Sequence, residues 1–410
     1  MPDDEKTLLL SKREDNPKVN YVTEQLPLQN NDQRNEDEAP NDRFLLVYIV
    51  FFIFGITTLL PYNMFINADS YFKKKFDSSE FIKTYYESFF TTCSFVSIFL
   101  MVFANIILVR YINQKVRVFF SVVFLGVVFI QPSIFVFIHT GGWVTWFFIM
   151  TLLTIVLINS FSAILQSSAY GLGGVFPSKY MQACMAGQGG AGFFASLTNI
   201  FCLAVFPTSE YKDTGFLYFL IGEAFVIFTI FIVIFVQFSK FYKYYTNQIV
   251  QYGEANSESR SVTVSVFIKD LKFVLSKVWL NALSVLLVFF VTLALFPGFI
   301  NGIKQQGHSL NTPDDKYWSA VMCFLLFNMD DMFGRMTPAL VAYPKNDWAI
   351  FGLVLCRFLF IPLFIFCNYQ PRISGLPVLF KWDGFPIIFN ILLGLSNALL
   401  ILVHQDNYLI

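Results

Sequence analysis

Four residues in one apolar segment combine an aromatic ring, an amide, an acid and a guanidinium. They are Phe324, Asn328, Asp331 and Arg335, within the stretch FLLFNMDDMFGR. On a helix they share a stripe about 60° wide, and Asp331 and Arg335 are close enough to pair. Such a stripe suits a polar ring with hydroxyl groups, which stacks on the aromatic and hydrogen-bonds the ionic groups. The alternative is an ion pair that only joins two helices.

A second polar stripe lies earlier in the chain. Asn159, Ser162, Gln166, Tyr170 and Gly173 share one face of an expected helix. The amide of Gln166 both donates and accepts hydrogen bonds, as the edge of a purine or pyrimidine requires. Hydrogen bonding between helices is the equally simple alternative.

The composition requires these polar residues to sit in a membrane protein. Of 410 residues, 56% are hydrophobic and only 14% are charged, whereas soluble domains are about 25% charged. The 28 Lys and Arg residues balance the 28 Asp and Glu residues, so no basic field is present to bind nucleic acid. Charges at bilayer depth are costly and mark functional positions by default. We therefore expect a polytopic protein whose partner is the lipid bilayer.

Ten apolar spans are expected. Each is long enough to cross a bilayer, which takes about 20 residues of helix, and too long for a barrel strand. Lipid-facing backbone must satisfy its own hydrogen bonds, so we expect an all-α fold. The predicted spans are residues 44–66, 88–109, 118–138, 143–173, 183–206, 215–239, 278–302, 317–341, 348–369 and 385–403.

The distribution of charge suggests the domain order. Residues 1–43 are polar and read as a disordered cytoplasmic tail. Lys and Arg are more frequent in the segments that lie inside when the N-terminus is inside. Residues 240–277 then form a cytoplasmic loop between a six-helix bundle at 44–239 and a second bundle at 278–410. A central loop between two bundles is typical of a rocking transporter.

Catalytic and metal-binding patterns are not found in the sequence. The six cysteines all fall in apolar spans and are interpreted as small core residues. The chain has no CxxC pair and no HExxH, GxSxG or Walker A motif. We expect no metal, no cofactor and no enzymatic activity.

Other intramembrane residues have several interpretations. Arg357 is expected to bind a carboxylate or helix-end carbonyls, and Asp330 to point away from the stripe of Asp331. Glu223 could be protonated in the core, pair with an arginine, or couple transport to protons. Small residues at every fourth position are expected to let another helix approach closely; these are Ala183, Gly187, Ala191 and Ala195.

Taken together and in order, several segments resemble the equilibrative nucleoside transporter family. The similarity covers about residues 44–400. The matching segments are Leu59-Leu60-Pro61-Tyr62-Asn63, Ala163-Ile164-Leu165-Gln166, Gly187-Gln188-Gly189, Ala191 to Ser196, Phe296-Pro297, Phe327-Asn328 with Asp331, Gly334 and Arg335, Cys356-Arg357 to Pro362, and Ser396-Asn397.

The resemblance implies facilitated diffusion of nucleosides by alternating access, in a fold similar to the major facilitator type. It also implies which residues face the substrate: Leu59, Tyr62, Gln166, Asn328, Asp331 and Arg335, with Phe95 as a looser match. Members of the family have eleven spans, and ten are predicted here. We therefore expect either a truncated form or a form in which the eleventh helix is dispensable.

The expected function is a nucleoside uniporter driven by the concentration gradient. A nucleobase or organic-cation carrier, possibly proton-coupled, is the alternative within transport, and a truncated regulatory form without transport is another. A receptor of the common type would have seven spans. We expect the plasma membrane as the location, although the acidic and leucine-rich segment at 5–10, EKTLLL, would also suit an endosome or lysosome.

Overall fold

The protein is almost entirely helical in the parts of the chain that its computed structural model describes. These are residues 40–206, 211–255, 264–306, 315–336, 346–370 and 377–406. Within those ranges there is no β-strand, only an isolated bridge between Ile303 and Tyr369. The expected N-terminal tail lies outside the described residues up to residue 39.

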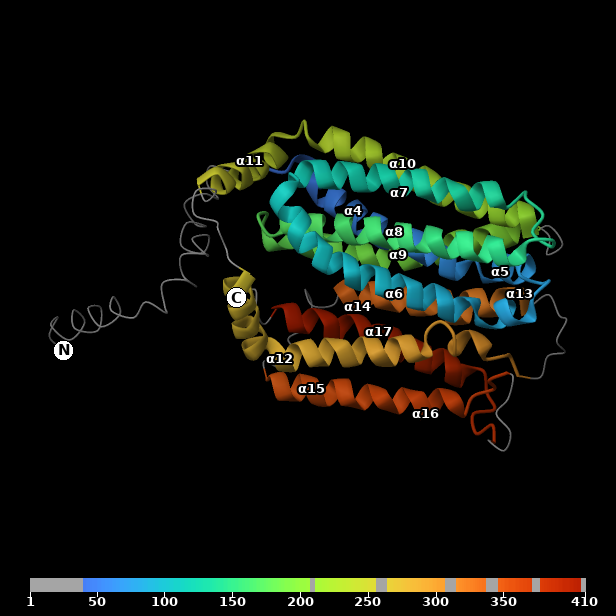
Figure 1. Ribbon diagram of the computed structural model, residues 1–410. Helices are drawn as coiled ribbons and strands as arrows, with labels where there is room; N and C mark the ends of the chain where they lie inside the picture. Colours follow the sequence, from blue (N-terminus) through green and yellow to red (C-terminus); the bar gives the residue numbers. More distant parts are fainter. Residues whose placement is uncertain are drawn as a thin grey trace.

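The first group of helices contains α4 to α11, and Figure 1 shows α4 and α6 to α10 lying side by side. Their bounds are α4 Leu46–Asn67, α5 Asp69–Lys75, α6 Glu80–Tyr111, α7 Gln114–Phe135, α8 Val144–Gly173, α9 Ser178–Val205, α10 Tyr211–Val236 and α11 Lys240–Ala255. α7 and α8 are separate helices; Gly141-Gly142 lies in the connection between them, whereas Gln131-Pro132 lies inside α7 and does not end it.

The second group contains α12 to α17. Their bounds are α12 Val264–Leu295, the 3₁₀ turn η3 Ile300–Gly302, α13 Asp315–Trp318, the π-helix η4 Ser319–Leu325, α14 Leu326–Met336, α15 Asp347–Cys356, the 3₁₀ turn η6 Arg357–Leu359, α16 Phe360–Ile365 and α17 Gly384–Asp406. α11 lies at one end of the molecule, and α5 and α13 lie at the other (Figure 1). The expected boundaries between bundles and loop stay a prediction.

Eight helices within the described ranges are long and apolar enough to cross a membrane, so the protein is an all-α polytopic membrane protein. The expected span at 317–341 appears as α13, η4 and α14, which are described only to Met336. The apolar part of α17 is the shorter stretch Gly384–Ala398. A total of ten spans therefore stays a prediction.

The two groups have separate hydrophobic clusters. The cluster of the first group is rich in aromatic rings: Phe72 lies 5.7 Å from Phe65, 5.9 Å from Phe76 and 5.0 Å from Phe90, measured between ring centroids. The second group has two smaller clusters, and the larger of them contains the stacked pair Phe296 and Phe327. Cys356 is exposed on α15, so the expectation that every cysteine is a core residue is wrong for that position. A helix in lipid can turn a small apolar side chain outward without cost.

Glycines bring α9 against α4. A Cβ atom at Gly187 would overlap the carbonyl oxygen of Phe52, and one at Gly55 would overlap that of Cys184. Ala183 and Ala191, one turn on either side of Gly187, are fully buried. The expected packing role of this small-residue stripe is confirmed.

The opposite face of α9 contacts the second group. A Cβ at Gly189 would lie 2.7 Å from the Cα of Met332, and one at Gly192 would overlap the side chain of Asn328. Both Met332 and Asn328 belong to α14. α9 is therefore the helix through which the two groups meet most closely.

We predict that Gly187→Ala destabilises the folded protein. The new methyl group would push against backbone, which cannot rotate away, and overpacking of this kind costs about 1–3 kcal/mol. The melting temperature in detergent, measured with the yield of monodisperse protein, reports the change.

Gly352→Ala is the matched control, because Gly352 is also helical and has open space around its Cα. Equal melting temperatures for the two variants would show that the α4–α9 contact is not as tight as described.

Candidate functional site

Asp331 and Arg335 form the predicted ion pair. The Nε of Arg335 donates to Oδ2 of Asp331 at 2.9 Å, and each side chain is 11% exposed. The other carboxylate oxygen, Oδ1, accepts from Nδ2 of Asn397 on α17 at 2.7 Å. Both oxygens of the acid are thus hydrogen-bonded, which a buried charge needs if it is to be tolerated.

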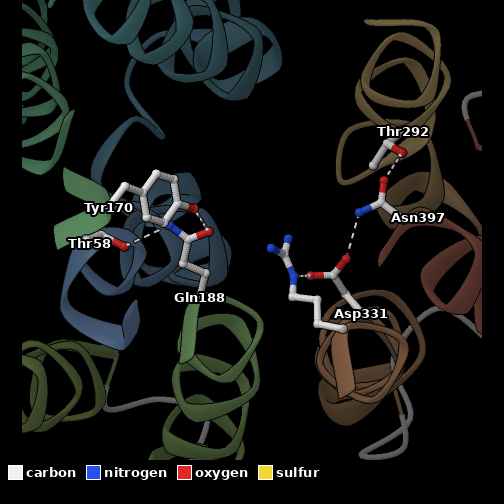
Figure 2. A network of polar contacts seen from close by, with 7 residues as sticks. Thr58, Tyr170, Gln188, Thr292, Asp331 and Asn397 are labelled. Carbon is white, nitrogen blue, oxygen red and sulfur yellow. Dashed lines mark hydrogen bonds and ion pairs between the residues drawn. The ribbon is translucent and has the colours of Figure 1, made fainter. Parts of the chain in front are cut away.

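The chain of hydrogen bonds continues from Asn397 into the second group. The Thr292 hydroxyl lies 2.7 Å from Oδ1 of Asn397 and 2.9 Å from the carbonyl oxygen of Val288. Its one hydrogen is shared between these two acceptors. Thr292 Oγ1 also accepts from Nη2 of Arg357 at 2.7 Å. Figure 2 shows Asp331, Asn397 and Thr292 in line. Three helices, α14, α17 and α12, and the 3₁₀ turn η6 are therefore joined behind the ion pair.

Arg357 ends this chain, and its partners differ from those expected. Its Nη1 donates to Ser396 Oγ at 2.8 Å and to the Leu393 carbonyl at 3.4 Å. The residue is 2% exposed. No carboxylate pairs with it among the described residues, and Leu393 lies within α17 rather than at a helix end. The expected carboxylate or helix-end partner is wrong because hydroxyls on α12 and α17 lie nearer.

The first group contributes a second polar cluster. The hydroxyl of Tyr170 donates to Oε1 of Gln188 at 2.8 Å, and Nε2 of Gln188 donates to Thr58 Oγ1 at 3.4 Å. Gln166 joins through Nε2, which lies 3.4 Å from the Tyr170 hydroxyl. The predicted stripe on α8 is thus extended by Gln188 on α9. Sequence reasoning treated Gln188 only as part of a motif, although an amide inside a run of small residues was a usable signal.

The two clusters face each other where α9 meets α14. Figure 2 shows Tyr170, Gln188 and Thr58 on one side, and Asp331, Asn397 and Thr292 on the other. A Cβ at Gly189, next to Gln188, would lie 3.0 Å from Cδ of Arg335. Gln166, Tyr170 and Arg335 are all partly exposed rather than sealed in the core. This junction presents amide, phenol and guanidinium groups together.

Asn328 belongs to a different polar bridge. Its Nδ2 donates to Ser196 Oγ at 3.0 Å, and the Ser196 hydroxyl lies 3.1 Å from Oδ1 of Asn67. Asn199 Nδ2 donates to the Asn67 carbonyl at 2.9 Å. All four are buried. This bridge, Asn328–Ser196–Asn67, joins α14, α9 and α4 about two turns from Arg335.

Three other predicted site residues have separate surroundings. Tyr62 is half-buried and hydrogen-bonds Thr91 on α6. Leu59 packs against the first hydrophobic cluster, and Phe95 is half-buried on α6. No contact described for these three residues joins them to the Asp331–Arg335 pair.

Phe324 lies at the far end of the predicted stripe, in the π-helix. It is 2% exposed, and its ring meets Phe296 edge-on at 5.8 Å. Nδ2 of Asn390 donates to the carbonyls of Met322 and Cys323 in the π-helix. Among the predicted site residues, Phe324 is the one that lines a cavity of about 270 Å³ at the end of the molecule where α5 lies.

Two buried acids lie apart from these clusters. Asp330, as expected, points away from Asp331, and its Cβ lies against Gly394 of α17. Glu223 is 7% exposed, and its Oε1 approaches Gly126 of α7. One carboxylate oxygen of each has no hydrogen-bond partner in the described structure. The expected option of an arginine partner for Glu223 is not found among the described ion pairs.

Comparison with known proteins supplies a consistent relationship. A family model described as nucleoside transporter matches residues 152–404. Equilibrative nucleoside transporter 1 from Homo sapiens is 32% identical over 411 residues, covering 88% of this chain and 89% of the relative. Equilibrative nucleoside transporter 2 from Homo sapiens is 30% identical, covering 89% of each chain. Equilibrative nucleoside transporter 3 from Rattus norvegicus is 30% identical, covering 88% of this chain and 81% of the relative.

We predict that Arg357 and Asp331 are energetically coupled although they do not touch. The hydrogen bonds through Thr292 and Asn397 connect them, and residues in one network typically couple by about 0.5–3 kcal/mol. Melting temperatures in detergent of Arg357→Met, Asp331→Asn and the double variant should therefore be non-additive.

Arg117 provides the matched control. It is a buried arginine, 6% exposed and bonded to Asn105 in the first group. The cycle of Arg117→Met with Asp331→Asn should be additive. If the Arg357 cycle is additive to the same degree, the hydrogen-bonded chain does not transmit the coupling.

Proposed function

The chain belongs to the equilibrative nucleoside transporter family, and we propose that it carries nucleosides down their concentration gradient through a site at the α9–α14 junction. The relatives that it resembles over most of their length are named as equilibrative nucleoside transporters, which supports a facilitative carrier rather than an enzyme. The observation that carries the site proposal is the meeting of the Gln188 cluster with the Asp331–Arg335 pair.

Arg335 is the central residue of the proposed site. Among the described residues, its hydrogen bond to Asp331 uses Nε. The two Nη groups are then available to a ligand, and a planar guanidinium suits the paired oxygens of a ribose or the edge of a base. The hydrogen bond from Nε to Asp331 orients Arg335. A hydroxyl-rich neutral solute can satisfy both groups without adding a charge to the membrane interior.

Gln166 supports recognition of the base from the opposite side. Its amide is half-buried and reaches the Tyr170 hydroxyl at a long 3.4 Å, so the bond is readily exchanged for one to a ligand. We assign Asn328, Phe324, Tyr62, Leu59 and Phe95 to the path and walls on either side. A site with buried polar groups discriminates strongly against solutes that leave those groups unpaired.

Alternating access requires the two helix groups to separate and rejoin around this site. The α9–α14 contact is built on glycines, so few side chains need to change rotamer when it opens. The Asn328–Ser196–Asn67 bridge lies between the proposed site and the 270 Å³ cavity. We assign it the role of a barrier that opens toward that cavity.

We further propose the plasma membrane as the location of this multi-pass protein. The acidic and leucine-rich segment at 5–10 is the feature that would favour an endosome or lysosome, and it lies outside the described residues. Surface biotinylation of the wild type and of Leu8→Ala/Leu9→Ala decides between them. A surface fraction that rises strongly in the variant would indicate an intracellular location for the native protein.

We predict that removing the ion pair abolishes transport without unfolding the protein. In Asp331→Asn/Arg335→Met, Asn397 keeps its acceptor and neither member of the ion pair is left as a charge without its partner, so folding should survive. Loss of the guanidinium should lower the rate of uridine uptake into proteoliposomes about a hundredfold or more, because an unmet buried hydrogen bond typically costs 1–3 kcal/mol and two are lost.

The surface pair Asp77→Asn/Lys83→Gln is the control, since those charges lie 2.6 Å apart but in exposed positions. That variant should transport normally. Normal uptake by the Asp331/Arg335 variant would show that the buried pair only joins helices. Competition by adenosine, uracil and an organic amine in the same assay ranks the solute classes.

A further inference from the structure

The two helix groups also meet at the end of the molecule where α5 and α13 lie, through Glu87 of α6 and Asn301 of η3. Nδ2 of Asn301 donates to Oε1 of Glu87 at 3.2 Å, and Asn301 is 8% exposed. Figure 1 shows α6 running obliquely toward this end. The distribution of Lys and Arg predicts that this end is extracellular. A carrier has to break such a contact before its outer side can open.

Glu87 is attached to the first group through a second hydrogen bond. Its Oε1 also accepts from the hydroxyl of Tyr86 at 3.2 Å, and one carboxylate oxygen can accept both bonds. The side chain of Tyr86 is 2% exposed, and its ring lies 5.4 Å from Phe90 and 5.5 Å from Phe76 between centroids. The acceptor for Asn301 is therefore held by the aromatic cluster of the first group.

Asn301 is attached in turn to the second group. Its Oδ1 accepts from the hydroxyl of Ser319, the first residue of η4. Beside it, the indole N–H of Trp318 donates to the Ile303 carbonyl at 2.9 Å, which joins the same two segments again. The amide of Asn301 thus uses its nitrogen for Glu87 and its oxygen for Ser319.

This connection reaches the helix of the proposed transport site. η4 continues directly into α14, which contains Asn328 and Arg335. A movement that withdraws α14 from α9 therefore pulls, through Ser319 and Asn301, on the hydrogen bond to Glu87. While that bond holds, the two groups stay joined at their outer ends.

The 270 Å³ cavity lies between this contact and the Asn328–Ser196–Asn67 bridge. Asn67 is on its wall together with Asn301 and Ser319. The wall comes from both groups, with α4, α5, α9 and α10 on one side and the segment around η3 with η4 on the other. Separation of the groups at Asn301 would therefore widen the cavity toward the outside.

We propose that Glu87 is a positioning residue of the carrier, which acts through Asn301 as an outer latch, Glu87–Asn301–Ser319, and keeps the cavity narrow. Its role in transport rests on the proposed function, because alternating access supplies the two states between which the latch selects. Glu87 is not among the described residues that line the cavity. It therefore changes the balance between the closed and the outward-open state rather than the contacts of the solute.

Thiol labelling tests the latch without any need for transport. Ala68→Cys places a reporter on the cavity wall, at a position that is 4% exposed, in the purified full chain in lipid nanodiscs. Glu87→Met removes the acceptor and should raise the rate of labelling by a charged maleimide about tenfold, equal to about 1.4 kcal/mol. Glu87→Gln keeps an oxygen acceptor and should raise the rate less. The same variants without Ala68→Cys give the rate of the native cysteines, which is subtracted.

Glu80→Met is the matched control, because Glu80 lies on the same helix with a side chain that is 85% exposed. It should leave the labelling rate of the reporter unchanged. Equal acceleration by Glu80→Met and Glu87→Met, or no acceleration by Glu87→Met, would overturn the proposal.

A reversible cross-link tests the same contact in a second way. In Glu87→Cys/Asn301→Cys, a short bifunctional methanethiosulfonate should join the two thiols, and uridine uptake into proteoliposomes should then be lost. Reduction with dithiothreitol should restore the uptake, and each single variant should keep its uptake after the same treatment. A cross-link that does not form, or full uptake by the cross-linked chain, would contradict the latch.

The proposed function and the latch fail in different ways. If the wild type does not carry uridine but Glu87→Met accelerates labelling and Glu80→Met does not, the transport function fails and the latch stands as the contact that keeps the cavity narrow. If the cross-linked and the reduced chain carry uridine equally well, the transport function stands and the latch fails.

Discussion

The structure depends on how one ion pair is tolerated in a chain that is mostly apolar. Asp331 and Arg335 sit on a helix that contacts both halves of the protein, and neither charge could stay there without further partners. Asn397, Thr292 and Arg357 supply them through a line of short hydrogen bonds. Each residue in this line hydrogen-bonds the next, so Asp331 is held in place and binds Nε of Arg335 where α14 meets Gly189 of α9.

Close helix packing determines where that guanidinium ends up. Lipid chains are as apolar as leucine, so helices in a membrane associate through close contact and hydrogen bonds rather than through the hydrophobic effect. α9 has glycines on two faces, one against α4 and one against α14. The glycines that let these helices approach therefore also bring the amide of Gln188 in the first group opposite the Asp331–Arg335 pair of the second group.

The sequence predicted the contacts between residues that are close together in the chain. Hydropathy located the spanning helices, and the four-residue separation of Asp331 and Arg335 predicted their contact. The partners of Arg357 could not be predicted, because Thr292 is 65 residues away in sequence and reaches it only through helix packing. The hydrogen bond from Asn390 to the π-helix likewise joins residues far apart, since Cys323 is 67 residues away in sequence. The contact of Lys75 with the end of α7 could not be predicted either, because Val136 is 61 residues away in sequence.

In the proposed function, the positions of the two polar layers would link binding to opening. Asn328 and Arg335 lie on the same helix, about two turns apart, and each faces α9 beside a glycine. Movement of α14 away from α9 would break the Asn328–Ser196 bond and at the same time withdraw Arg335 from the Gln188 cluster. A solute that bonds to both sides at the level of Arg335 opposes that withdrawal, whereas nothing comparable holds the Asn328 layer. The proposed barrier would therefore open while the solute stays bound, which is the order of events that a carrier with alternating access requires.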